Sequence, residues 1–308
     1  MSTAPTVHPP DRATYPWLGP GALEVIGGDF ELRSNHFKRK EWISYTFADT
    51  CLANLSLICK GDPTHRPECR LILSPAGNGK SMILNKLYSM VPKLEGSAHA
   101  QHIPVIKINA PPQPNLSALC NLLLTQTGAP ILKGEPAVQC LVRTCDLLQS
   151  VGLRVLIIDE IQDILSGKTE HYRTMRKSLR YISNQVKVSI IAAGTKEART
   201  PINEDPTLRS RFQPLILPRW GNNAAFRDLL SKFQKQLPLR NESNLLEPSV
   251  QERIFKASEG RIGEVFNLLS HALEVAIKSE MERIDHDVLD YSGCMAPCAN
   301  WEVEHDLD

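Results

Sequence analysis

A short glycine-containing segment followed by lysine and serine carries the residues for phosphate chemistry. The segment is Ser74, Pro75, Ala76, Gly77, Asn78, Gly79, Lys80 and Ser81. It lies between an apolar run, 70–73, and a helix-compatible stretch, 81–90, which is the context of a phosphate-binding P-loop. Glycines let backbone amides face a phosphate, Lys80 reaches the β- and γ-phosphates, and the Ser81 hydroxyl can ligate Mg²⁺. We therefore predict ATP and Mg²⁺ as cofactors. The consensus begins with glycine, and Ser74 departs from it.

Two adjacent carboxylates, Asp159 and Glu160, end the apolar run 155–158. A buried strand of a parallel sheet places its last residues at the rim where α/β proteins bind ligands. We predict that Asp159 holds Mg²⁺, directly or through water, and that Glu160 acts as the general base on the attacking water. A solvated strand end is the alternative for such a pair.

Four further positions are candidates for the same site. Thr195 follows the apolar run 188–192 and either senses the γ-phosphate or caps a helix. Arg211 is our choice for an arginine finger that reaches the nucleotide of an adjacent subunit, with Arg209 as its competitor. Arg261 begins a later helix and either contacts the γ-phosphate or has a surface or capping role.

The helix predicted over 170–184 carries a basic face apart from its apolar stripe. The basic residues Arg173, Arg176, Lys177 and Arg180 recur at spacings of three and four. This face is solvated, pairs with an acidic partner, or contacts the DNA backbone. In the last case, repeated subunits would add phosphate contacts and make binding strongly salt-dependent.

Alternating apolar runs and amphipathic stretches indicate an α/β fold. The strand-like runs are 70–73, 103–108, 153–158, 188–192 and 214–217, and the intervening helical stretches are 81–90, 116–126, 138–151 and 170–184. Strands that are apolar on both faces and separated by helices predict a parallel sheet with helices on both faces. Beyond residue 219 the sequence has only helical candidates, at 223–236, 248–258, 261–279 and from about 285. They predict a small C-terminal helical lid domain.

Composition shifts divide the chain into four parts. We predict an extended N-terminal arm (1–35), an ATPase core with leading helices (36–218), a helical lid (219–292) and an acidic tail (293–308). The arm prediction rests on clustered prolines and glycines. The tail carries Glu302, Glu304, Asp306 and Asp308. It is interpreted as a flexible tail or a docking peptide.

The overall composition excludes several classes of protein. The formal net charge of +1 argues against a protein that coats polyanions through bulk charge, although it permits a local basic face. The sequence has neither an apolar run of about 18 residues nor an N-terminal signal pattern, so we expect a cytoplasmic protein without a membrane partner. The 8 cysteines are too sparse for a disulfide scaffold, so we expect them to be thiols in a reducing compartment. Two groups invite a metal interpretation, Cys59 with His65 and Cys69, and Cys294 with Cys298, but neither has the paired spacing of a zinc site.

Taken in order, these motifs resemble those of AAA+ P-loop ATPases and, within that class, the TniB family of transposition proteins, which is related to TnsC and MuB. The similar segments are CRLILSPAGNGKSMI, VLIIDEIQDIL, AAGTKEA, LRSRFQPLILPRW and SEGRIGEVFNLL, within a resemblance that spans residues 36–291. The resemblance implies an ATPase that assembles on double-stranded DNA as a ring or helical filament. It further implies that the protein selects or delivers a target site and activates a DDE transposase, with a TniQ-type protein as another partner. A helicase-loader-type ATPase and a signalling ATPase that does not act on DNA are the alternatives.

Overall fold

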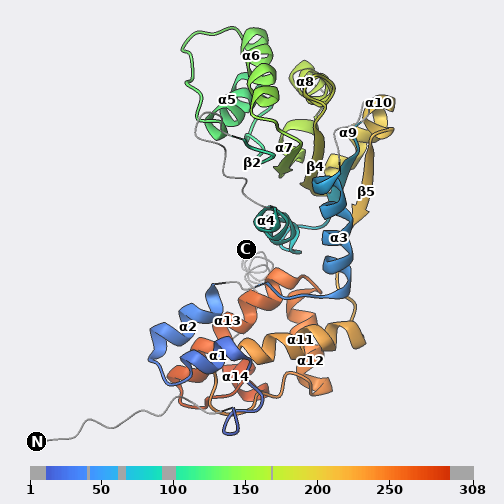
Figure 1. The fold of residues 1–308 in the computed structure, drawn as a ribbon. Coiled ribbons are helices and arrows are strands. Elements are labelled where there is room, and N and C mark those ends of the chain that lie inside the picture. Colours follow the sequence, from blue (N-terminus) through green and yellow to red (C-terminus); the bar gives the residue numbers. More distant parts are fainter. Residues whose placement is uncertain (1–11, 40–41, 62–66, 92–101, 168, 292–308) are drawn as a thin grey trace, which may run out of the picture. The chain divides into compact units, whose positions relative to one another are not determined.

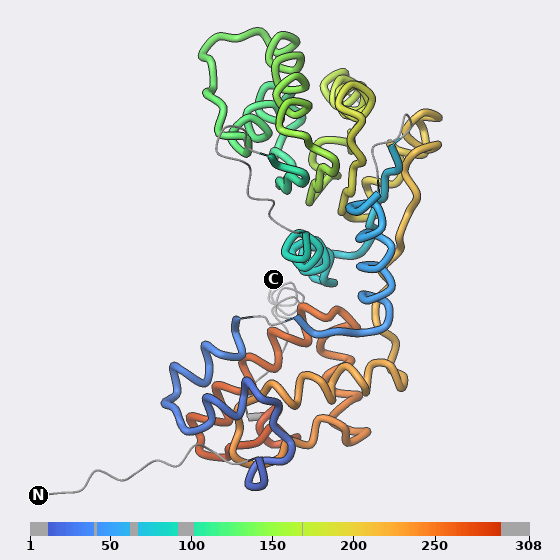
Figure 2. Tube along the Cα trace, in the orientation of Figure 1, coloured from blue at the N-terminus to red at the C-terminus, as the bar shows by residue number. Residues whose placement is uncertain are grey.

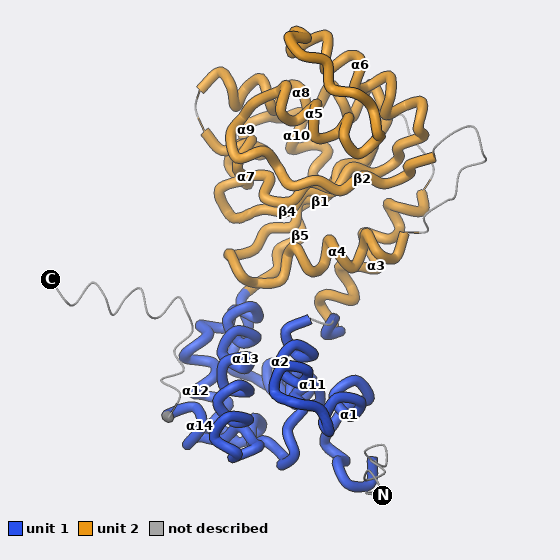
Figure 3. Tube along the Cα trace, turned by 90° about the vertical axis from the view of Figure 1, so that its left-hand side faces the viewer, with its two compact units in different colours: residues 1–45, 219–308 blue, residues 46–218 orange. Residues whose placement is uncertain are grey.

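The computed structural model describes residues 12–39, 42–61, 67–91, 102–167 and 169–291. The chain divides into two compact units (Figure 3). We call Thr46–Pro218 the sheet unit, and Met1–Tyr45 together with Arg219–Asp308 the helical unit. The acidic tail predicted at 293–308 lies outside the described residues. Both ends of the chain thus contribute to the helical unit.

A five-stranded parallel sheet forms the centre of the sheet unit (Figure 1). Its strands are β1 (Cys69–Leu73), β2 (Val105–Asn109), β3 (Val155–Asp159), β4 (Ser189–Gly194) and β5 (Phe212–Ile216). Their order across the sheet is β2-β3-β4-β1-β5. All residues of β3 are buried, as expected for a strand covered on both faces. The predicted parallel α/β sheet is confirmed.

Helices cover both faces of this sheet. On one face, α4 (Lys80–Met90) contacts β3 and β4, and α3 (Thr46–Lys60) packs beside α4. On the other face lie α5 (Leu116–Gln126), α6 (Ala137–Ser150) and α8 (Glu170–Val186). The short helices of the unit are α7 (Gln162–Leu165), η1 (Lys196–Ala198), α9 (Arg199–Glu204) and α10 (Pro206–Arg209). The layered arrangement therefore agrees with the sequence pattern.

Helices from both ends of the chain build the helical unit. They are α1 (Pro20–Val25), α2 (Phe30–Lys38), α11 (Ala224–Gln236), α12 (Pro248–Ser258), α13 (Ile262–Lys278) and α14 (His286–Tyr291). The Cα trace shows α1 and α2 beside the C-terminal helices (Figure 2). The Phe37 ring of α2 stacks on Phe266 of α13, with 5.2 Å between ring centroids. The helical C-terminal region predicted from the sequence is confirmed.

Residues 12–35 differ from the extended arm that we expected. Pro20 stands at the first position of α1, where a missing N–H is tolerated. Asp29 caps α2 by accepting a hydrogen bond from the Leu32 amide at 2.8 Å. A small core gathers Leu18, Ala22 and Ile26. Proline and glycine here mark helix boundaries within a packed segment, so the prediction of an extended arm is wrong for residues 12–35.

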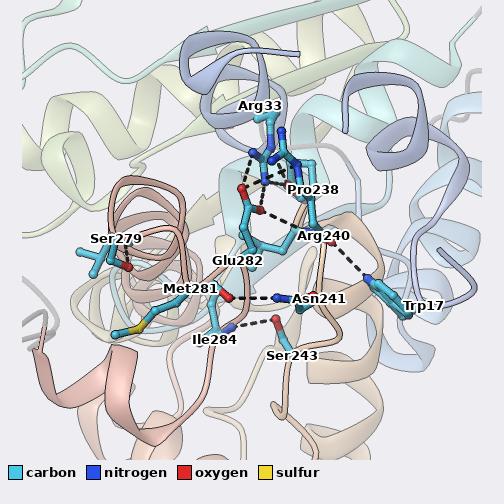
Figure 4. A network of polar contacts seen from close by, with 12 residues as sticks. Trp17, Arg33, Pro238, Arg240, Asn241, Ser243, Ser279, Met281, Glu282 and Ile284 are labelled. Atoms are coloured by element: carbon cyan, nitrogen blue, oxygen red, sulfur yellow. Dashed lines mark hydrogen bonds and ion pairs between the residues drawn. The ribbon is translucent and has the colours of Figure 1, made fainter. Parts of the chain in front are cut away.

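A buried ion pair fastens α2 to the C-terminal part of the helical unit (Figure 4). The Arg33 side chain donates to both carboxylate oxygens of Glu282 and, at 2.7 and 2.9 Å, to the Pro238 carbonyl oxygen. Burial alone would raise the pKa of Glu282, but hydrogen bonds from Arg33 and from the Arg240 amide hold it below its ordinary value. The ion pair therefore stabilises the fold fully at pH values above the ordinary carboxyl pKa. This stabilisation is lost as the pH falls through the lowered pKa of Glu282 in the folded protein.

Arg33→Ala is expected to destabilise the protein by about 3–5 kcal/mol, because it leaves the buried Glu282 carboxylate without its partner. Urea unfolding followed by circular dichroism measures this change. Arg39→Ala is the matched control, since Arg39 is exposed at the end of the same helix. It should alter stability by less than about 0.5 kcal/mol. Equal effects of the two substitutions would contradict a structural role for the ion pair.

Two kinds of feature are not found among the described residues. No helix there is both long enough and apolar enough to cross a membrane. No cluster of three or more His, Cys, Asp or Glu side chains there is arranged to hold a metal ion. Cys59 and Cys69 are free thiols. The other residues considered for zinc, His65, Cys294 and Cys298, lie outside the described ranges.

Candidate nucleotide-binding site

The P-loop (residues 74–81) connects β1 to α4 and has the backbone of an anion cradle. Gly77 and Gly79 have φ values of 69° and 90°, a region that residues with a Cβ rarely adopt. Gly79 is the N-cap of α4, and no side chain in the described part of the chain caps this helix. The first amides of α4 are therefore available to a phosphate. The Lys80 ammonium donates to the carbonyl oxygens of Ser74 and Pro75, both at 3.1 Å, and Ser81 follows it in the first turn.

Ser74 fits the first position of the P-loop without a glycine. Its backbone N–H donates to the Gly194 carbonyl oxygen at 3.2 Å, which extends the pairing of β1 with β4 by one residue. Its φ lies outside the left-handed region, so a Cβ is tolerated there. Ala76 and Gly77 are exposed at the tip of the loop. The departure from the consensus thus leaves the loop geometry intact.

Asp159 and Glu160 lie within electrostatic range of Lys80. Asp159 is 4% exposed at the end of β3, and its Oδ1 accepts the Glu160 amide hydrogen at 3.0 Å. Glu160 is half-buried and has a left-handed φ of 51°. Burial lowers the pKa of Lys80, while the charges of Glu160, Asp159 and Glu197 act in the opposite direction. The structure therefore brings the predicted lysine and the predicted carboxylates together.

Thr195 lies at the same edge of the sheet. It follows β4, the strand between β1 and β3, so it lies between the P-loop and the carboxylates. Thr195 is the N-cap residue of η1, but its side chain makes no capping hydrogen bond there. A hydrogen bond from Thr195 lowers the pKa of Glu197. Thr195 thus lies near the predicted nucleotide site and also at the start of a short helix, and its role as γ-phosphate sensor or as cap stays a prediction.

Arg211 lies at the opposite end of the strands from the P-loop of its own chain. It precedes Phe212, which pairs with Cys69 at the start of β1, whereas the P-loop follows the end of β1. Five residues of strand rise about 13 Å, which is longer than an arginine side chain. Arg211 is half-buried, and its Nη1 has no hydrogen-bond partner among the described residues; Arg209 is exposed. The structure does not bring Arg211 to its own P-loop.

Arg261 belongs to the helical unit. It is the N-cap residue of α13 and follows Gly260, whose φ is 66°. Its Nη2 pairs with Glu259 Oε2 at 3.1 Å, and Glu259 also pairs with Arg219 at 3.4 Å. Because the P-loop belongs to the sheet unit, a contact of Arg261 with the nucleotide stays a prediction.

The basic residues of α8 fall into two pairs. Arg176 and Arg180 are half-buried and donate to oxygens elsewhere in the sheet unit, at 3.0 and 3.4 Å. The side chains of Arg173 and Lys177 are 63% and 67% exposed, and both lie near Glu170, at 3.5 and 3.9 Å. Exposed charge on this face is therefore concentrated at Arg173 and Lys177.

A family model described as "Bacterial TniB protein" matches residues 33–222, which is well over half of the chain. The chain belongs to the TniB family. The matched range contains the P-loop, Asp159, Glu160 and the basic face of α8, so the resemblance inferred from these motifs is confirmed. No match is found among curated proteins.

Solved structures similar to this TniB-family chain include ORC and Cdc6 proteins. The Aeropyrum pernix ORC2 protein, in ADPNP-ADP complexes, has a TM-score of 0.60 at 20% identity, covering 84% of this chain and 70% of that one. The Aeropyrum pernix ORC1 protein in complex with DNA has a TM-score of 0.62 at 16% identity, covering 84% and 68%. Cdc6p from Pyrobaculum aerophilum has a TM-score of 0.58 at 14% identity, covering 84% and 70%. The predicted AAA+ fold is confirmed.

Two polar residues of this TniB-family site have contacts that the sequence did not predict. Asn78, which is 1% exposed, donates from Nδ2 to the carbonyl oxygens of Leu217 and Pro218 at 3.3 and 2.8 Å, and so anchors the P-loop to the segment after β5. Gln162 contacts both Glu160 and Thr195. The position of Gln162, two residues after Glu160, was the available signal, but spacing alone does not show where its amide points.

Proposed function

We propose that this TniB-family protein is an ATP-hydrolysing regulator of DNA transposition. It assembles on double-stranded target DNA, selects or delivers the target site and activates a DDE transposase, with a TniQ-type targeting protein as a further partner. The family match over residues 33–222 carries the proposal. The P-loop and carboxylate geometry within that range supports the ATP-dependent part of it.

ATP binds at the P-loop in this proposal, with its phosphates against the amides of α4 and the Lys80 ammonium. The Ser81 hydroxyl and the Asp159 carboxylate would hold Mg²⁺, because hard oxygen ligands of this kind suit that ion. Bound Mg²⁺ neutralises charge on the phosphate oxygens. Glu160 orients the attacking water and accepts its proton, while Thr195 contacts the γ-phosphate. Arg261 adds a contact from the helical unit.

The arginine finger requires a second subunit. Since Arg211 lies at the end of the sheet remote from its own P-loop, a neighbouring copy must bring it to a nucleotide. Such a head-to-tail contact gives a ring when it closes and a helical filament when it does not. A finger supplied in this way contributes on the order of 10³–10⁵ in rate. Arg209, which is exposed, is the competing residue.

DNA contacts the exposed face of α8 in this proposal. Each subunit presents Arg173 and Lys177, and an oligomer repeats them along the duplex. Phosphate contacts of this kind give binding that depends strongly on salt and little on base sequence. The Aeropyrum pernix ORC1 protein, which shares the fold, was solved in complex with DNA.

Reversal of Arg173 and Lys177 to Glu is expected to weaken DNA binding equally for all sequences. The slope of log K against log salt concentration should fall in magnitude by about 2 per subunit, because two phosphate contacts are lost. Fluorescence anisotropy with a labelled duplex at several salt concentrations measures both quantities. The matched control reverses Arg227 and Lys256, two exposed cations of the helical unit, and makes the same change in net charge. If both double variants lose the same affinity, α8 is not the DNA face.

One experiment tests the proposed function as a whole. ATP hydrolysis is measured with and without duplex DNA, and with and without the cognate transposase. We expect stimulation by DNA and a further change with the transposase, together with oligomers on DNA in electron micrographs when a non-hydrolysable ATP analogue is present. Hydrolysis that is indifferent to DNA would identify a nucleotide switch that does not act on DNA. Stimulation by DNA and a replicative helicase, without a response to transposase, would identify a helicase loader.

A further inference from the structure

The Gln162 side chain joins the carboxylate pair to the tip of β4. Gln162 is the first residue of α7 and is half-buried. Its Nε2 donates to Glu160 Oε2 at 2.6 Å and to Asp163 Oδ1 at 3.3 Å. Its Oε1 accepts the backbone amide hydrogen of Thr195 at 3.2 Å. Both ends of the amide are therefore engaged.

These partners determine which way the amide faces. Ionised carboxylates only accept hydrogen bonds and a backbone N–H only donates, so the NH₂ group must face Glu160 and Asp163. Turning the amide by 180° would place its oxygen against two carboxylates and its NH₂ group against the Thr195 N–H. The contact thus needs a side chain with a donor on one side and an acceptor on the other. A glutamate of the same size lacks the donor.

Gly194 provides the space that the amide occupies. A Cβ at Gly194 would lie 2.7 Å from Gln162 Oε1 and 2.9 Å from Ile161 Cγ2, both closer than a normal contact. The segments are also joined by a hydrogen bond of 2.9 Å from the Ile161 amide to the Ala193 carbonyl oxygen. Glycine at 194 is therefore explained by the close approach of both Gln162 and Ile161.

Glu160 needs such a support. Its φ of 51° is sparsely populated for a residue with a Cβ and persists where neighbouring groups hold it. Lys80 attracts its carboxylate, whereas Asp163 repels it. Lys80 and Asp163 thus act on the Glu160 carboxylate in opposite senses. The hydrogen bond from Gln162 holds this carboxylate in one orientation. A general base has to be held in this manner, because a misplacement of about 1 Å can cost a factor of roughly 10² in rate.

We propose that Gln162 is a positioning residue that holds the Glu160 carboxylate in register with the Thr195 amide. The base and the γ-phosphate contact at the tip of β4 then move as one hydrogen-bonded unit. This inference rests on the proposed role of Glu160 as the base for ATP hydrolysis. It adds a residue to the site and a reason for Gly194.

The test separates ATP binding from hydrolysis in the full-length protein with duplex DNA present. Gln162→Ala and Gln162→Glu are each expected to lower the single-turnover rate of ATP hydrolysis by roughly 10²-fold. The Kd for ATPγS, measured by calorimetry, should change less than about threefold, since the P-loop is untouched. The matched control is Gln126→Ala, an exposed glutamine at the end of α5, which should keep both values. Gly194→Ala should reproduce the loss with Gln162 still present, and it serves as the test if Gln162→Ala does not fold.

A double-mutant cycle decides between positioning and a general structural role. In a Glu160→Gln background, Gln162→Ala should cause little further loss of rate, because the residue that it positions no longer acts as a base. An independent loss in that background, or a parallel loss of ATPγS affinity, would overturn the inference. Absence of ATP hydrolysis by the wild-type protein, with DNA and transposase present, would instead count against the proposed function.

Discussion

Glu160→Gln is expected to leave ATP bound while slowing its hydrolysis by roughly 10²–10⁴, the range that a positioned general base contributes. The substitution keeps the size of the side chain but removes its ability to accept a proton from water. ATP binding persists because the P-loop glycines and Lys80 are unchanged. Single-turnover hydrolysis of radiolabelled ATP measures the rate, and calorimetry with ATPγS measures the affinity.

The control for this variant is Glu204→Gln, an exposed carboxylate at the end of α9. Its rate should stay within about twofold of wild type. In the proposed mechanism the Glu160→Gln protein also remains on DNA as a long-lived oligomer with ATP, since hydrolysis is the step that releases it. Normal turnover by Glu160→Gln would remove this residue from the chemistry, whatever the oligomer does.

The sheet unit was predictable because its strands are short and apolar on both faces. β3 is the clearest case, since all its residues are buried and its sequence is a continuous apolar run up to Asp159. Burial on both faces is a property that the sequence itself carries. The P-loop was predictable for a similar reason, because the strand, the glycines, Lys80 and the following helix are neighbours along the chain.

The N-terminal helices could not be predicted in the same way. The buried positions of α2 include Arg33, Ser34 and His36, which are residue types that patterns assign to the surface. Arg33 is buried because Glu282 neutralises it, and that partner lies 249 residues further along the chain. A pattern of neighbouring residues in the sequence does not reveal a contact with a partner so far along the chain.

The polar contacts of the site show the same limit. Periodicity correctly places the four basic residues together on α8: Arg173, Arg176, Lys177 and Arg180. It does not show that Arg176 and Arg180 donate hydrogen bonds to oxygens of their own subunit. The amide of Asn78 likewise reaches carbonyl groups after β5. Long polar side chains have several rotamers, and tertiary neighbours decide among them.

Lys80→Ala is expected to abolish detectable ATP binding, with an increase in Kd of at least about 10²-fold. Lys80 is 4% exposed, and its ammonium makes two hydrogen bonds at the P-loop, to Ser74 and Pro75. With phosphate bound, charge-assisted hydrogen bonds of this kind contribute about 1.5–3 kcal/mol each. Its removal also takes away a positive charge that offsets the nearby carboxylates of Asp159 and Glu160. Calorimetry with ATPγS gives the affinity directly, and assembly on DNA should be lost with it.

Stability measurements distinguish this loss from misfolding. Without nucleotide, Lys80→Ala should still unfold in a single cooperative thermal transition, because Lys80 begins α4 beside the P-loop and is not part of the hydrophobic core. A saturating ligand raises the Tm of a protein that binds it, so ATPγS should raise the Tm of wild type and leave that of Lys80→Ala unchanged. Lys86→Ala is the matched control, because Lys86 lies further along the same helix, α4. The Tm of this variant should rise with ATPγS as that of wild type does. A normal rise of Tm in Lys80→Ala would show that nucleotide binds elsewhere and would contradict the assignment of the P-loop.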